Sequence, residues 1–377
     1  MRIAIAAPVS KRPEQGVANV VYNTADALRA RGHEVACLFL EDVAPPGPGP
    51  IPRFQEIYFA ARLAAHLARR RDEFDVVNIH APSGIAYGLF RRVGWGTNLP
   101  PNVMLIHGIE ERRNQAMRRE AAQGRAPQFR LKNRLWQYVY HMPLYRFAIL
   151  TADHSVVINR ETWSMLQLKY GRDIARVWYV PNGVESYFFV PRERSPNAQR
   201  LLFVGHWLDH KGIHYLREGF EILAGQNKNL RLTIAGCGVE ARTVETSFAA
   251  SVRDQLDVLP LVSRREMPDL YARHDIFLFP SLFEGLPIVL LEAMASGMAV
   301  VTTETCGMMD VIEDGYNGLL VKPAHTGELV AAVERLLGSP ELARRLGEAG
   351  RESARRYTWA RVAEQLEKVF RLAASGA

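Results

Sequence analysis

Two carboxylates, Glu284 and Glu292, interrupt a mostly apolar stretch of the chain at residues 279–301. The pattern predicts the end of a buried strand, a tight turn, a helix that begins at Pro287 and a second buried strand. An unpaired charge is costly to bury, so each carboxylate needs a partner. An arginine or lysine elsewhere in the chain would satisfy Glu292. The alternative is a ligand with hydroxyls at both ends and a phosphate between them, bound by free N–H groups at the start of the helix. A sugar nucleotide is such a ligand.

Other segments of the second half carry residues suited to a diphosphate. Lys211 can neutralise phosphate as a point charge, while Gly205 and Gly212 keep the loop around it close to a ligand. Backbone N–H groups of Gly285 and Leu286 can bind phosphate oxygens. Each feature is a weak signal alone, but together and in this order they indicate one binding site.

Vicinal hydroxyls can donate two hydrogen bonds to one carboxylate. Glu292 therefore suits a ribose and Glu284 a hexose, at opposite ends of the same ligand. We expect contacts to the base from backbone near Gly236 and from Val262.

Alternating strands and helices must position these residues. In the second half, strands are predicted at residues 201–204, 230–235, 258–262, 275–279, 299–303 and 319–321. The first half repeats the pattern, beginning with a strand at 2–7, a helix at 17–31 and a strand at 34–40. This alternation predicts an α/β fold of two Rossmann-like, doubly wound parallel sheets, in which ligands bind outside the carboxyl ends of the strands.

Two residues of the first half stand at such positions. His107 follows a predicted strand at 103–106, where a functional histidine would lie, although a structural role is an equal alternative. Gly16 precedes the helix at 17–31. It would let the backbone approach a ligand closely, or it would only form a tight turn.

Composition limits the class of protein. The 377 residues are 48% hydrophobic and 23% charged, as in a globular protein of about two domains. Three widely separated cysteines favour free thiols in a reducing compartment. The first residues predict a buried strand rather than a signal peptide, and no run of about 18 apolar residues occurs. We therefore expect a cytoplasmic protein, with contact to a membrane from that side as an option.

The net charge of +7 indicates an anionic partner. Basic residues gather at 112–146, close to several aromatic residues. The basic members are Arg112, Arg113, Arg118, Arg119, Arg125, Arg130, Lys132, Arg134 and Arg146, and the neighbours include Trp136, Tyr138, Tyr140, Met142 and Tyr145. This composition suits an anionic membrane interface or a polyanionic acceptor, but a solvated helix face with its aromatic residues in the core is the favoured alternative. Without a recognisable binding module, we expect no nucleic acid partner.

Here the residues resemble a family, the retaining glycosyltransferases of family 4 (glycosyl transferases group 1), which have the GT-B fold. The resemblance covers nearly the whole chain. Its motifs are the pair Glu284 and Glu292 spaced as E-x7-E, the Gly205 to Gly212 loop, PNGV at 181–184, EDGYNGLLV at 313–321 and YTW at 357–359. It implies an acceptor-side domain at 1–183, a donor domain at 184–357 and a last helix, at 358–377, that crosses back to the first domain.

The resemblance also implies roles for single residues. Glu292 would bind the nucleotide ribose, Lys211 the diphosphate and Glu284 the hydroxyls of the transferred sugar. His107 would lie beside the reacting sugar, and Gly16 would sit under the phosphates. The family's catalysis is independent of metal, and no Asp-x-Asp motif stands at a strand end of this chain. The donor is a co-substrate, so no cofactor is expected.

The chain departs from the family pattern at three places. His206 follows the first glycine of the phosphate loop, where the family usually has arginine, so one fixed positive charge is missing or supplied elsewhere. The usual Gly-Gly-x-Pro-Glu reads Cys-Gly-Met-Met-Asp at 306–310. Val17 and Ala18 replace a small residue and an acid, so acceptor contacts cannot be carried over there.

The combined hypothesis is a transferase that moves a sugar from a UDP- or GDP-sugar to an acceptor hydroxyl. A lipid-linked or cell-envelope glycan is the preferred acceptor and a small molecule the alternative. Two other functions fit the same fold: a sugar-nucleotide-binding protein without transfer activity, and a GT-B epimerase or phosphorylase.

Overall fold

The computed structural model describes residues 1–12, 16–43, 55–93, 98–126, 139, 141–189 and 199–376. By contacts within the chain, the protein divides into two compact units. The first comprises Met1–Ile109, Leu131–Asn182 and Trp359–Ala377, and the second comprises Glu110–Arg130 and Gly183–Thr358.

The first unit contains a six-stranded parallel sheet of order β2-β1-β3-β4-β5-β6. Its strands are β1 (Arg2–Ala6), β2 (Glu34–Leu38), β3 (Val76–His80), β4 (Asn102–Ile106), β5 (His154–Val157) and β6 (Val177–Tyr179). The inner strands β3 and β4 are buried along their whole length, because helices cover both faces of the sheet.

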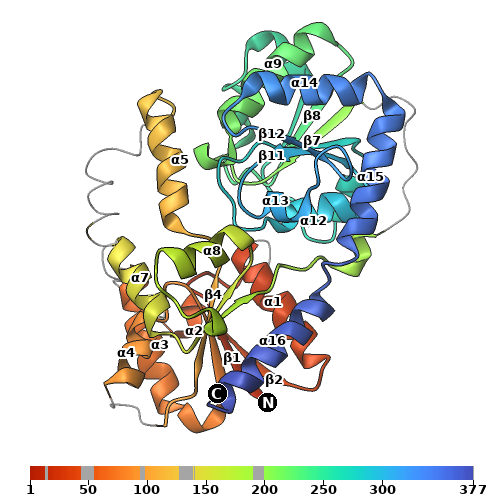
Figure 1. Ribbon diagram of the computed structural model, residues 1–377. Coiled ribbons are helices and arrows are strands. Elements are labelled where there is room, and N and C mark those ends of the chain that lie inside the picture. The colour runs from red at the N-terminus through yellow and green to blue at the C-terminus, as the bar shows by residue number, and fades with distance from the viewer. Residues whose placement is uncertain are drawn as a thin grey trace. The chain divides into compact units, whose positions relative to one another are not determined.

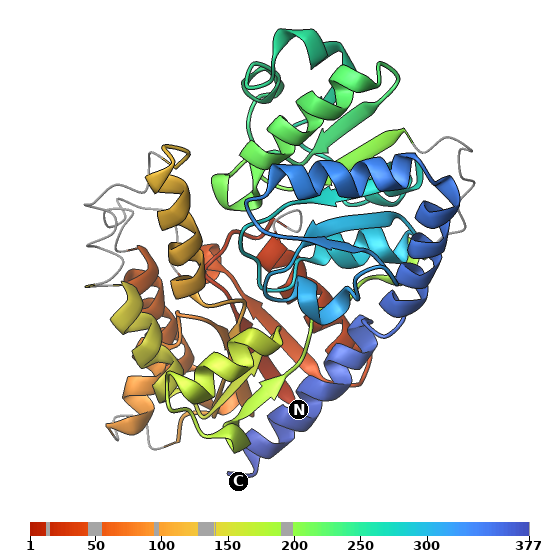
Figure 2. The same cartoon turned by 45° about the horizontal axis from the view of Figure 1, so that its top comes forward.

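Helices cover this sheet (Figure 1). They are α1 (Gly16–Arg29), α2 (Leu40–Val43), α3 (Gln55–Arg69), α4 (Ile85–Arg92), α7 (Met142–Thr151), α8 (Arg160–Leu168) and α16 (Trp359–Ala374). Phe59 and Leu63 of α3 pack with Tyr87 of α4 in one apolar core. The C-terminal helix α16 lies beside α1, as Figures 1 and 2 both show, and buries Trp359 and Phe370.

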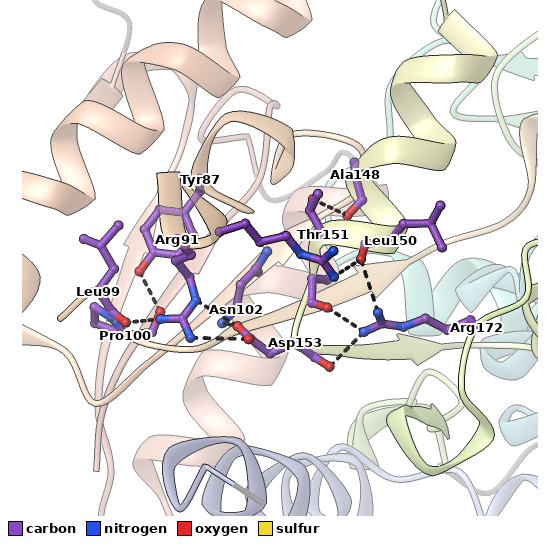
Figure 3. A network of polar contacts seen from close by, with 12 residues as sticks. Tyr87, Arg91, Leu99, Pro100, Asn102, Ala148, Leu150, Thr151, Asp153 and Arg172 are labelled. Carbon is purple, nitrogen blue, oxygen red and sulfur yellow. Dashed lines mark hydrogen bonds and ion pairs between the residues drawn. The ribbon is translucent and has the colours of Figure 1, made fainter. Parts of the chain in front are cut away.

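A polar network joins the start of β4 to the start of β5 (Figure 3). The Asp153 carboxylate accepts a hydrogen bond from the Asn102 N–H at 2.7 Å and pairs with Arg91 at 3.0 Å. The buried Arg172 guanidinium donates to the carbonyls of Ala152 and Asp153 at 2.6 and 2.8 Å. Burial lowers the pKa of Arg172 to about 10, so the group stays charged at neutral pH.

The second unit contains another six-stranded parallel sheet, of order β12-β11-β10-β7-β8-β9. Its strands are β7 (Arg200–Val204), β8 (Arg231–Ala235), β9 (Leu256–Leu259), β10 (Ile276–Phe279), β11 (Ala299–Thr303) and β12 (Leu319–Val321). The chain runs outward from β7 to β9, then returns to β10 on the other side of β7. The strand order therefore reverses between β7 and β10, and a crevice at such a point is where ligands bind in doubly wound sheets.

Figure 1 shows α9 and α14 over one face of this sheet and α12 and α15 under the other. The helices of the unit are α5 (Glu110–Ala122), α9 (Ile213–Gln226), α10 (Ala241–Glu245), α11 (Met267–Ala272), α12 (Ile288–Ala295), α13 (Met308–Val311), α14 (Thr326–Leu337) and α15 (Pro340–Ala354). Two six-stranded parallel sheets with flanking helices confirm the predicted fold class.

The units differ from the predicted domains at residues 110–130, and by one residue at each of the boundaries 183 and 358. The sequence assigned residues 110–130 to the first domain, but α5 groups with the second unit because it packs against the chain around α9. The Tyr215 hydroxyl of α9 donates to buried Glu120 of α5 at 2.7 Å, and Arg125 pairs with Glu218 at 2.9 Å.

Parts of the predicted basic and aromatic stretch lie outside the described residues. They are Arg130, Lys132, Arg134, Trp136, Tyr138 and Tyr140. Residues 190–198 lie outside the described residues as well.

Replacement of Arg172 by methionine tests the network of the first unit. The substitution leaves two carbonyls without their buried donor, so we expect the free energy of unfolding to fall by about 2 to 3 kcal/mol. Chemical denaturation of the whole protein measures this loss. Arg176→Met is the matched control: Arg176 is exposed, so its loss should change stability by about 0.5 kcal/mol or less. Equal effects of the two substitutions would contradict a structural role for Arg172.

Candidate functional site

Lys211 and Glu284 form an ion pair where the strand order of the second sheet reverses. Lys211 follows β7 and Glu284 follows β10, and the Lys211 Nζ lies 2.5 Å from a Glu284 carboxylate oxygen. The same oxygen accepts a hydrogen bond from the Ser281 hydroxyl at 3.1 Å. Each side chain keeps part of its surface exposed, 18% for Lys211 and 14% for Glu284. A cation and a carboxylate are thus both open to a ligand at this edge of the sheet.

The backbone holds the two loops together. The Leu282 N–H donates to the His210 carbonyl at 2.8 Å, which links the loop after β10 to the loop after β7. Gly212 has φ +73°, and a Cβ built on it would lie 1.9 Å from the Pro280 carbonyl oxygen. Only glycine allows this approach. Glycine at Gly212 is therefore required by the backbone of the same unit, and the predicted closeness of its loop to a ligand stays a prediction.

Glu292 is fully buried and has protein partners. One carboxylate oxygen lies 2.6 Å from Nη1 of Arg264, and the other accepts a hydrogen bond from the Tyr271 hydroxyl at 2.8 Å. Nη2 of Arg264 also pairs with Glu185, at 2.5 Å. The Phe188 ring lies under the guanidinium, 5.1 Å from its Cζ. The ion pair that the sequence left as an alternative for Glu292 is present, and the ribose role of Glu292 stays a prediction.

Burial dominates the electrostatics of this cluster. Burial raises the pKa of Glu292, and the charge of Arg264 opposes that shift only in part. Burial disfavours the charged Arg264 guanidinium as well, but its two carboxylate neighbours outweigh burial and raise its pKa. The pKa of Tyr271 is raised well above its usual value by burial and by Glu292, so its hydroxyl remains a donor.

Glycines shape the ends of the neighbouring strands. Gly205 follows β7 with φ +151°, and Gly236 follows β8 with φ +65°. Gly238 makes room for the exposed His206, because a Cβ on it would lie 3.1 Å from the imidazole. Between Gly205 and the helix α9, the basic side chains are His206, His210 and Lys211. Burial lowers the pKa of His210 to about 4, so it adds no charge at neutral pH.

The helix α12 begins one residue later than the sequence predicted. Pro287 is its N-cap with ψ 127°, an extended conformation, and Ile288 is the first helical residue. Glu292 still lies in the second turn. The Gly285 carbonyl accepts a hydrogen bond from Gly307 at 2.8 Å, and Leu286 is buried beside it.

Val262 lies in the loop after β9, not in the strand. The strand ends at Leu259, and Pro260 follows directly, which has no N–H to continue the ladder. Val262 is half-buried and lies two residues before Arg264. The predicted contact between Val262 and a base would therefore be made by a loop residue.

In the first unit, His107 pairs with another histidine. Nε2 of His107 lies 2.9 Å from Nδ1 of His80, which ends the neighbouring strand β3. Burial lowers the pKa of His107 to about 4 and that of His80 well below its usual value. Both rings are neutral at pH 7, so the pair can donate and accept hydrogen bonds but supplies no positive charge.

Gly16 is the exposed first residue of α1. A Cβ on Gly16 would meet nothing within 4 Å, so packing in the first unit does not require glycine there. Its predicted place under the phosphates stays a prediction.

Sequence reasoning missed three members of the charged cluster and one of the histidine pair. His80 carries the signal that singled out His107, a polar side chain at the end of a buried strand. Arg264, Glu185 and Tyr271 carry no such signal, because each comes from a different element and pairs only through the fold.

No helix of the described residues is both long and apolar enough to cross a membrane. Within the same part of the chain, no three His, Cys, Asp or Glu side chains gather as metal ligands would.

Two family models match the chain and together span most of it. "Glycosyltransferase Family 4" matches residues 15–186, and "Glycosyl transferases group 1" matches residues 188–353. Among curated proteins, the chain is 32% identical over 173 residues to alpha-D-kanosaminyltransferase of Streptomyces kanamyceticus. That match covers 45% of this chain and 45% of the relative, so it spans less than half of either protein.

Solved structures share the fold across the whole chain. A sucrose-phosphate synthase from Thermosynechococcus elongatus has a TM-score of 0.80 at 19% identity and covers 100% of both chains. The Anabaena protein HepE in complex with UDP-glucose has a TM-score of 0.70 at 16% identity and covers 98% of both. At these identities the likeness concerns the fold.

Gly212→Ala tests the contact between the two loops. The added Cβ meets the Pro280 carbonyl and requires a left-handed backbone, so we expect a loss of about 2 kcal/mol or more in the free energy of unfolding. Gly225→Ala in the same helix is the control. That position is exposed and open, and alanine there should stabilise by about 0.5 to 1 kcal/mol. Thermal or urea denaturation measures both changes. An unchanged free energy of unfolding for Gly212→Ala would contradict the close contact between the two loops.

Proposed function

This chain belongs to the glycosyl transferases group 1, and from that premise we propose that it transfers a sugar from a nucleotide diphosphate to an acceptor hydroxyl. We further propose a UDP- or GDP-hexose as donor, transfer with retention of the anomeric configuration, and no requirement for a metal. The UDP-glucose in the HepE complex supports a nucleotide sugar of this kind as the donor.

The ion pair of Lys211 and Glu284 is the observation that carries the proposal. A cation and a carboxylate lie together where the sheet order reverses, and this supports a donor in which a diphosphate is next to a hexose. When the bond between the sugar C1 and the diphosphate breaks, negative charge grows on the leaving oxygen. Lys211 and the N-terminal N–H groups of α12 would stabilise that charge.

The reaction can then finish on the same face of the sugar. The acceptor oxygen forms its bond to C1, and its proton passes to the departing diphosphate. Glu284 would hold the sugar hydroxyls, and the neutral His107 would orient the sugar by hydrogen bonds rather than by charge. Glu292 would bind the ribose.

Lys211→Met should lower turnover about a hundredfold, because the loss of one charge-stabilising contact costs about 3 kcal/mol of barrier. Release of nucleotide diphosphate from UDP- and GDP-sugars, with and without acceptor, measures it. Lys228→Met is the control, since Lys228 is exposed and follows the C-terminal end of α9, whereas Lys211 precedes its N-terminal end. A wild-type protein that binds donor but neither hydrolyses nor transfers it would instead support the non-catalytic sugar-nucleotide-binding alternative.

We propose a lipid-linked or cell-envelope acceptor reached from an anionic membrane surface, in a cytoplasmic protein. Support comes from α5, on which Arg112, Arg118 and Arg119 are exposed. A small-molecule acceptor is the alternative.

Flotation with liposomes tests the membrane contact. Binding should require anionic lipid and fall as salt rises, because screening shortens the reach of surface charges. The variant Arg112→Gln with Arg119→Gln should bind less. Binding that is insensitive to lipid charge and to salt would count against the idea.

A further inference from the structure

Glu292, the predicted ribose ligand, cannot be reached in this structure. Its side chain has 0% exposure, while Arg264, which contacts it, is 23% exposed. Among Glu292, Arg264 and Glu185, the guanidinium is the most exposed group. The Glu292 oxygen next to it lies 2.6 Å from Nη1 of Arg264. A carboxylate oxygen has two lone pairs, so this oxygen can accept a hydrogen bond from a hydroxyl once Arg264 moves.

Arg264 has a second partner, Glu185, with which it would stay paired after leaving Glu292. Its Nη2 lies 2.5 Å from Glu185, whose carboxylate also accepts a hydrogen bond from the Tyr187 hydroxyl at 3.1 Å. Tyr271 remains as a donor to the other oxygen of Glu292. If Arg264 moved toward Glu185, no charge of the cluster would lose every partner.

Arg264 already contacts both carboxylates, so a shift of its side chain alone would release Glu292. Arg264 lies in the segment between β9 and α11, in which Leu261, Ser263 and Arg265 are exposed. This is also the segment of Val262, the predicted neighbour of the base. A nucleoside that docks against Val262 would thus approach the residue that covers Glu292.

We propose that Arg264 is a displaceable counter-ion of Glu292: it occupies the carboxylate in the empty protein and yields it to the ribose hydroxyls when the nucleotide binds. This inference rests on the proposed function. Because only the fraction of molecules with Glu292 released can bind ribose, the apparent dissociation constant is the intrinsic one divided by that fraction. Arg264 and Glu185 together then set the donor affinity, although neither touches the reacting atoms.

Two variants of the cluster should change affinity in opposite directions. Glu185→Gln removes the alternative partner of Arg264, so Arg264 binds Glu292 more firmly and UDP or GDP should bind several-fold more weakly. The double variant Arg264→Gln with Glu185→Gln keeps the formal charge of the cluster at minus one, because it removes one positive and one negative group. It frees Glu292, and the same nucleotide should bind about tenfold more tightly than to the wild type.

Isothermal titration with UDP and GDP, and with their 2′,3′-dideoxy analogues, separates this role from a structural one. The analogues lack the hydroxyls, so their affinities should be equal in all three proteins. Weaker binding of UDP or GDP to both variants, or a parallel change with the analogues, would overturn the inference. Thermal denaturation checks that each variant is folded. If the double variant is not folded, Glu185→Gln alone tests the inference: it should bind UDP or GDP more weakly than the wild type does, while its affinity for the dideoxy analogues should be unchanged.

The same titration keeps the two proposals apart. A wild-type protein that binds none of the nucleotide diphosphates contradicts the proposed function itself. A wild-type protein that prefers UDP or GDP to the dideoxy analogues, with variants that show no opposite changes, contradicts only the role of Arg264.

Discussion

The site depends on how closely the loop after β7 approaches the loop after β10. One backbone hydrogen bond, from Leu282 to His210, and one glycine without a side chain, Gly212, set this distance. Lys211 stands between those two points, and its ammonium is thereby directed to Glu284. The cation is thus placed by main-chain geometry at the reversal of strand order, where a mobile four-carbon side chain would otherwise be free to point elsewhere.

Much of the fold could be predicted from the sequence because both halves repeat one local pattern. Strands such as β11 and β12 are short apolar runs, and the predicted bounds of both are confirmed. The resemblance to the glycosyl transferases group 1 is confirmed by the two family models, and it depended on motifs at strand ends. The late start of α12 escaped prediction because proline suits the N-cap as well as the first helical position.

The charged cluster could not be predicted, because its members meet only in the folded unit. Arg264 of the segment after β9 pairs with Glu292 of α12 and with Glu185 of the segment before β7. In the sequence, an ion pair and a ligand were competing explanations for one buried carboxylate. In the structure the ion pair with Arg264 is present, so the pairing explains how the buried charge is tolerated without a ligand.

Each unit takes one segment from the other half of the chain: α16 completes the first, and α5 completes the second. During synthesis the first unit must wait for α16 to leave the ribosome, while α5 emerges before α9, which it will contact. A cut between residues 182 and 183 would therefore yield two fragments that are each incomplete. Glu120 would lose Tyr215, and α1 would lose the helix beside it. Folding of the two halves is in this sense a single event, even though each has its own sheet.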